Sequence, residues 1–139
     1  MQFPLFTPPT EWVMPDGYPD LTHAKEVAID LETRDPNLLS HGSGWARGDG
    51  EVIGVAVSAG SDSWYFPIRH FNGGNLDPKQ TLAWVKDLCS VDRDYIMHNA
   101  LYDAGWLWRE QRELHLLLPL LSLEYCTSYI YSICFLIFS

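Results

Sequence analysis

The chain has 139 residues, which fits a single domain with a sizeable core. Hydrophobic residues make up 47% of it and charged residues 19%, and this composition excludes global disorder. The net charge of −9 excludes a protein that grips DNA by its own positive charge alone. An acidic protein acts on nucleic acid when divalent metal ions supply the positive charge. The three cysteines, an odd number without the spacing of a metal site, favour a reduced, cytoplasmic setting.

Residues 1–24 hold five of the nine prolines. Proline fixes φ and removes a backbone donor, so this stretch is a poor helix or sheet former. We expect an extended arm that lies on the domain, with Trp12 and Val13 as its anchors.

Residues 25–113 have the pattern of an α/β core. Apolar runs and turn residues predict three strands and a hairpin over the turn AGSD, at 26–31, 52–58 and 63–67. Residues 34–50 and 70–77 are rich in Gly, Asn and Pro and are expected to be loops.

Two helices and one more strand complete the predicted core. Asp77 and Pro78 form an N-cap and first-turn pair that opens a helix over 78–88. A short strand at 95–98 is expected to lie beside the first strand. The next helix, 100–110, carries Leu101, Ala104, Leu107 and Trp108 at helical spacing, which predicts its buried face.

Two carboxylates follow the first apolar run. On a strand, Asp30 and Glu32 lie on one face, roughly 7 Å apart along the chain. Such neighbours repel each other, and Mg²⁺ or Mn²⁺ is the counter-charge that suits hard oxygen ligands. Acids also commonly end solvated strands, so this pair alone is weak evidence for a metal site.

A second polar set lies where the fourth strand meets the following helix. Asn99 and Asp103 are spaced i, i+4, which places both on one helix face near its N-terminus. An ordinary N-cap and a favourable acid in the first helical turn also explain them.

Together these sets resemble the DEDD superfamily of 3′–5′ exonucleases, and most closely the proofreading domain of family A DNA polymerases, including phage versions. The resemblance covers about residues 25–110 and is carried by AIDLETRDPN, GWARGDGEVIGVAVS, WYFPIRH, GGNLD and MHNALYDAGWL. It implies an α/β, ribonuclease H-like mixed sheet flanked by helices. It also implies hydrolysis of DNA from 3′ ends with two Mg²⁺ or Mn²⁺ ions.

The resemblance assigns roles residue by residue. Asp30, Glu32 and Asp103 would be the catalytic, metal-binding carboxylates. Thr33, Asn99 and Tyr102 match positions that line the site or touch the terminal nucleotide. The implied partners are single-stranded DNA 3′ ends and a polymerase domain encoded elsewhere, in a bacterial or phage-infected cell and without a membrane.

The family pattern is incomplete after residue 113. It requires a fourth carboxylate in a Tyr-x-x-x-Asp or His-x-x-x-x-Asp motif, and no Asp follows Asp103 in this sequence. Residues 114–139 are strongly apolar, with Glu124 as their one charged side chain. We favour a truncated or frame-shifted end here, ahead of a buried strand and helix of the core and a membrane segment. We therefore expect the C-terminal part of the fold to be atypical and exonuclease activity to be weak.

Two further functions stay open from the sequence. A ribonuclease D-type exoribonuclease uses the same ions on RNA, and nothing in the residues separates DNA from RNA. A catalytically dead remnant that binds nucleic acid or protein also fits, because the fourth carboxylate is missing.

Overall fold

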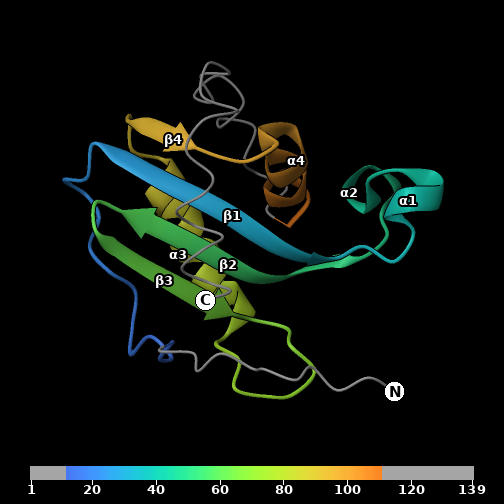
Figure 1. Cartoon of the computed structure of the whole chain (residues 1–139), viewed down its shortest axis with the longest axis horizontal. Helices are drawn as coiled ribbons and strands as arrows, with labels where there is room; N and C mark the ends of the chain where they lie inside the picture. The colour runs from blue at the N-terminus through green and yellow to red at the C-terminus, as the bar shows by residue number, and fades with distance from the viewer. Residues whose placement is uncertain (1–11, 111–139) are drawn as a thin grey trace, which may run out of the picture.

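The computed structural model describes residues 12–110, which form one mixed four-stranded sheet with helices against it (Figure 1). The strand order is β3-β2-β1-β4. The elements in chain order are β1 (Glu26–Arg34), α1 (Leu38–His41), α2 (Gly44–Arg47), β2 (Glu51–Ala59), β3 (Asp62–Pro67), α3 (Pro78–Cys89), β4 (Asp94–Ile96) and α4 (Ala100–Glu110). This arrangement confirms the predicted α/β class with a mixed sheet flanked by helices, and it is consistent with a ribonuclease H-like fold.

The strand connections follow from local chemistry. β1, β2 and β3 are antiparallel neighbours, and β2 and β3 join through a tight turn in which Gly60 has a φ of +62°. Pro67, which lacks a backbone donor, ends β3 at the edge of the sheet. α3 then crosses behind the sheet and returns the chain to β4, which pairs in parallel with β1 (Figure 1). The Asp77 side chain caps α3 by accepting from the Gln80 N–H at 2.8 Å, as predicted.

One face of the sheet forms the core with the helices. This face carries side chains of β1 (Val27, Ile29 and Leu31) and of β2 (Val55 and Val57), and side chains of α3 and α4 meet them in one apolar cluster. Its fully buried members include Val27, Ile29, Val55, Val57, Val85 and Trp106. Burial of this apolar surface stabilises the sheet and fixes both helices against it.

The other face carries the acidic residues of β1. Ala28, Asp30 and Glu32 alternate with the core residues, and the two acids pair across the ladder with Ala56 and Gly54 of β2. A register shift follows directly, between Glu32 and Thr33. The neighbours of the acids are therefore small residues, and the Tyr65 ring lies over one of them, Gly54.

The N-terminal arm lies on the domain, but its anchor differs from the predicted one. Val13 is 79% exposed, so its predicted role is wrong, whereas Trp12 makes an edge contact with Tyr65. The principal anchor is Tyr18, whose ring stacks on Trp84 at 5.3 Å and whose hydroxyl hydrogen-bonds Thr81 at 2.9 Å. A half-buried aromatic ring buries more apolar area than an exposed Val.

Two other predictions differ from the structure, and the predictions for the two termini concern residues that the structure does not describe. The loop predicted at 34–50 contains the short helices α1 and α2. On α4, Leu107 is buried as predicted, whereas Leu101 and Trp108 are exposed. Asp103 and Trp106 are buried in their place, so the predicted buried face is wrong in part. Residues 1–11 and 111–139, with the predictions made for them, lie outside the described residues. Of the helices in residues 12–110, none has the length and apolarity of a membrane span.

Candidate active site

Asp30 projects from the middle of β1 beside two other titratable groups. Partial burial raises the pKa of its carboxyl group above the ordinary value, and the electrostatic attraction of nearby His98 opposes that rise. His98 lies just after β4, the strand that pairs with the first residues of β1. The parallel pairing of these two strands therefore brings the start of α4 to Asp30.

Asp103 lies in the first turn of α4 and is almost completely buried, with 2% of its surface exposed. The recorded pairing of β4 with β1 ends at Ala28, and further along β1 the Leu31 N–H donates to the Asp103 carboxyl group. Burial, followed by repulsion from Asp30, raises the pKa of Asp103 to about 8, although the Leu31 hydrogen bond lowers it.

Asp30 and Asp103 form an interacting carboxylate pair. The Asp103 Oδ2 atom is buried and has no hydrogen-bond donor among the residues that the structure describes. A buried carboxylate oxygen without a donor is costly, and a nearby second acid increases that cost. A divalent cation between the two would remove both penalties, so this pair fits a metal ligand set.

Glu32 lies on the same sheet face as Asp30, two residues further along β1. Within residues 12–110, no group of three or more His, Cys, Asp or Glu side chains has an arrangement that could hold a metal ion. Glu32 instead interacts electrostatically with Tyr65. Burial is the main cause that raises the pKa of the Tyr65 hydroxyl, and the negative charge of Glu32 raises it further. The structure thus brings two of the three predicted carboxylates together.

Asn99 occupies a turn that only a few residue types tolerate. Its φ is +53°, in the left-handed region, where Asn is among the better-tolerated residues. Its carbonyl accepts from the Tyr102 N–H at 2.8 Å, and its side chain is exposed beside α4. Asn99 therefore sets the angle between β4 and α4 and remains accessible for a ligand.

Thr33 and Tyr102 meet at the end of β1. The Thr33 Oγ1 and Tyr102 hydroxyl oxygens are 2.9 Å apart, and the Tyr102 hydroxyl also donates to Asp35 Oδ2 at 3.2 Å. Two residues that the resemblance assigned to the terminal nucleotide are thus in direct contact. Asp35, their partner, was not predicted.

A second pair missed by the sequence reasoning lies near Glu32. The Tyr65 hydroxyl and His70 Nε2 are 2.6 Å apart, and their rings meet edge to face. Tyr65 lies across Gly54, where an added Cβ would be 2.0 Å from the hydroxyl oxygen. The signal in the sequence was the glycine inside an otherwise apolar strand, which indicates close approach of a neighbour.

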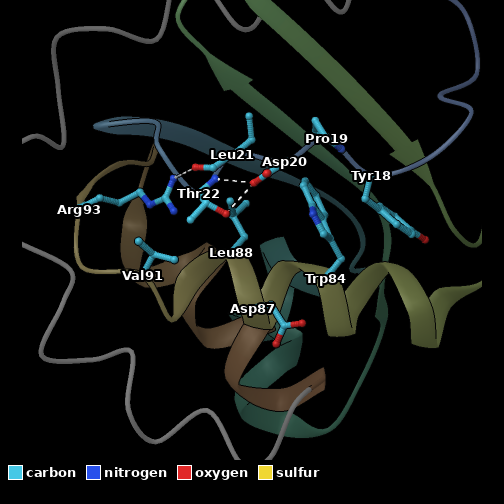
Figure 2. Close-up of a pocket in the computed structure, with 10 residues that line it drawn as sticks. All are labelled: Tyr18, Pro19, Asp20, Leu21, Thr22, Trp84, Asp87, Leu88, Val91 and Arg93. Carbon is cyan, nitrogen blue, oxygen red and sulfur yellow. Dashed lines mark hydrogen bonds between the residues drawn. The ribbon is translucent and has the colours of Figure 1, made fainter.

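A cavity of about 320 Å³ lies elsewhere, between the arm, α3 and the segment before β4 (Figure 2). Arg93 donates to the Leu21 carbonyl there, and this contact ties the arm to the segment before β4, whereas Thr22 donates to Asp20 within the arm itself. The lining residues are Tyr18, Pro19, Asp20, Leu21, Thr22, Trp84, Asp87, Leu88, Val91 and Arg93. None of the predicted site residues is among them.

The comparisons with known proteins give one informative relative. No family model matches this chain. The chain is similar to a DNA-directed DNA polymerase of Pseudomonas phage M6, with 40% identity over 114 residues. The match covers 77% of this chain and 17% of that polymerase, so the chain spans a small part of its relative's length. The similarity relates this chain to part of a phage DNA polymerase, in agreement with the predicted relationship to DNA polymerases.

Proposed function

We propose that this chain is a 3′–5′ exonuclease-type domain associated with a DNA polymerase, acting on single-stranded DNA 3′ ends. The observation that carries the proposal is the Asp30–Asp103 pair, with its buried oxygen that lacks a donor. An acidic pair of this kind suits a divalent cation, and phosphodiester backbones need positive charge from such a cation at an acidic site. The similarity to a phage DNA polymerase favours DNA over RNA as the substrate.

In this proposal one set of residues binds the cation and another set orients the nucleotide. Asp30 and Asp103 would hold Mg²⁺ or Mn²⁺, with Glu32 as the third carboxylate on the same sheet face. The bound ion would supply Lewis acidity and a more acidic water for phosphodiester hydrolysis. Thr33, Asn99 and Tyr102 would orient the terminal nucleotide.

Turnover is a less direct readout of the Asp30–Asp103 pair than cation binding, because turnover also depends on how the DNA 3′ end is placed. Cation binding is therefore a sharper first test than hydrolysis. Isothermal titration with Mn²⁺ should show binding that falls at least tenfold in Asp30→Asn and in Asp103→Asn. Asp62→Asn, which changes an exposed acid at the start of β3, is the matched control and should bind as wild type does.

A 5′-labelled oligo(dT) supplies the second readout. Its binding should depend on the divalent cation, and slow loss of nucleotides from the 3′ end should disappear in Asp30→Asn. If wild type binds no more Mn²⁺ than the Asp103→Asn variant does, the proposal is wrong. Tighter binding of oligo(U) than of oligo(dT) would favour the ribonuclease D-type alternative.

A catalytically dead, nucleic-acid-binding domain is the second candidate function. It is favoured by the finding that, among the residues described, no three acidic or imidazole side chains converge on one point. The number of Mn²⁺ ions bound separates the two candidates. Two ions support the hydrolytic domain, whereas one ion with oligonucleotide binding but without turnover supports the second candidate.

A further inference from the structure

Asp35, just beyond β1, has a buried carboxylate that joins three parts of the chain. Its side chain is 2% exposed. Its Oδ2 atom accepts from the Gly44 N–H at 2.8 Å and from the Tyr102 hydroxyl at 3.2 Å, and its Oδ1 atom lies 3.4 Å from Arg47 Nη2. Burying a carboxylate costs free energy unless donors satisfy it, and these three donors come from α2 and α4.

These contacts fix the direction of the hydrogen bonds around Tyr102. An ionised carboxylate only accepts, so the Tyr102 hydroxyl gives its one proton to Asp35. The Tyr102 oxygen is then left as an acceptor, and the Thr33 hydroxyl donates to it over 2.9 Å. Asp35 thereby determines both the position of the phenol ring and the donor direction at Thr33.

The segment that carries Asp35 is braced firmly against α4. Gly105 of α4 lies directly under the Trp45 indole, since an added Cβ there would be 2.3 Å from the ring. Arg109 of α4 donates to the carbonyl oxygens of Asp49 at 2.6 Å and of Gly44 at 3.3 Å. The Asp35–Tyr102 contact is therefore reinforced by further contacts on the same face of α4, because Tyr102, Gly105 and Arg109 are spaced i, i+3 and i+7.

We infer that Asp35 is a positioning residue for the 3′-terminal nucleotide, acting through Tyr102. This inference rests on the proposed function, in which Thr33 and Tyr102 contact that nucleotide. Tyr102 directly precedes Asp103 on α4, and its hydroxyl contacts Thr33, which lies three residues after Asp30 on β1. Loss of the Asp35 contact frees the phenol ring and weakens recognition of a 3′ end without removing a proposed cation ligand.

The test is a double-mutant cycle of Asp35→Asn and Tyr102→Phe, read as binding of 5′-fluorescein oligo(dT) in Mn²⁺. The oligonucleotide is supplied with a 3′-hydroxyl or a 3′-phosphate, so that selectivity for the free end is measured as a ratio. Asp35→Asn should reduce the affinity for the 3′-hydroxyl form about three- to tenfold, the size expected for one charge-assisted hydrogen bond. In the Tyr102→Phe background, Asp35→Asn should have almost no further effect.

Asp49→Asn is the matched control. Asp49 also binds Arg47, at 3.1 Å, and it lies on the same segment, but it has no recorded contact with Tyr102. Its substitution should leave the 3′-end selectivity unchanged. Independent, multiplicative losses from Asp35→Asn and Tyr102→Phe, or an equal loss in Asp49→Asn, would overturn the inference.

Two results separate this inference from the proposed function. Wild type that shows no Mn²⁺-dependent binding of either oligonucleotide overturns both. Wild type that binds and selects the 3′-hydroxyl form, with selectivity unchanged in Asp35→Asn, overturns the inference alone. If Asp35→Asn does not fold, Tyr102→Phe decides, because it removes the same contact without a change of shape, and full selectivity in that variant contradicts the role of Asp35.

Discussion

The backbone N–H of Leu31 donates a hydrogen bond to the side chain of Asp103, and this contact fixes the first turn of α4 to the middle of β1. It forms beyond Ala28, the last β1 residue with a recorded β4 partner. One oxygen of Asp103 is thereby satisfied, whereas Oδ2 has no donor within the described region. The fold thus holds a carboxylate in a position that favours its neutral form, beside a second acid whose pKa is also raised.

This arrangement predicts a pH-dependent stability that Asp103→Asn removes. The pKa of Asp103 is about 8 in the folded protein and about 3.9 in an unfolded chain. Between these values the folded state binds a proton that the unfolded state has lost, so the contribution of Asp103 to the free energy of unfolding decreases as pH rises from about 4 to about 8. Asn keeps an acceptor for Leu31 and carries no charge.

Urea denaturation at several pH values checks this prediction. Asp103→Asn should equal wild type near pH 4 and exceed it at pH 8 by on the order of a few kcal/mol. Mn²⁺ at pH 8 should raise the melting temperature of wild type and leave that of the variant unchanged. Equal stability of both proteins across the whole pH range would show that Asp103 ionises normally.

Gly105→Ala is predicted to destabilise the protein, although Ala is the better helix former by about 1 kcal/mol. The new Cβ would lie 2.3–2.6 Å from three atoms of the Trp45 indole, a rigid ring that packs between α2 and α4. We expect a net loss of about 1–3 kcal/mol in urea denaturation.

Gly17→Ala is the control for that variant. Gly17 is exposed, and an added Cβ there would meet no atom within 4 Å. Its substitution should change stability by less than about 0.5 kcal/mol. A stabilised Gly105→Ala variant would mean that α2 moves away from α4 without cost.

The sequence predicted those parts of the fold that local patterns control. The apolar run before Asp30 predicted β1, the turn AGSD predicted the hairpin, and Asp77 with Pro78 predicted the start of α3. Each pattern depends on neighbours within a few residues. Asp103 was likewise visible as an acid in the first turn of a predicted helix. Asn99, which was expected on the same helix face, instead lies before α4 with a positive φ.

Contacts between distant segments were not predictable from the same patterns. Asp35 reads as a loop acid, and its role appears only when α2 and α4 supply its donors. The Tyr65–His70 pair depends on a strand end and a loop that meet over Gly54. The α4 face was misjudged because its buried side includes the polar Asp103, which hydropathy assigns to solvent.

Tyr18 is predicted to hold the N-terminal arm on the domain. Tyr18→Phe removes the 2.9 Å hydrogen bond to Thr81 and should cost about 1 kcal/mol. Tyr18→Ala also removes the stacking on Trp84 and the contact with Phe66, and should cost about 2–3 kcal/mol. Hydrogen exchange of residues 18–24 should accelerate in Tyr18→Ala. Val13→Ala, at an exposed position, should behave as wild type does, and equal exchange in all variants would place the anchor elsewhere.

Gly54→Ala is predicted to displace Tyr65, because the new Cβ would lie 2.0 Å from the phenol oxygen and 2.5 Å from Cζ. The ring must move away, which breaks the 2.6 Å hydrogen bond between the Tyr65 hydroxyl and His70 Nε2. Each of the two groups then loses this hydrogen-bond partner. We expect a loss of about 2–4 kcal/mol in urea denaturation, from overpacking and the lost hydrogen bond together. Tyr65→Val removes the obstructing ring, so the Gly54→Ala substitution should cost at least 1 kcal/mol less in that background. Strictly additive losses in the double variant would contradict a steric origin and indicate that Ala at position 54 acts on the β2 backbone instead.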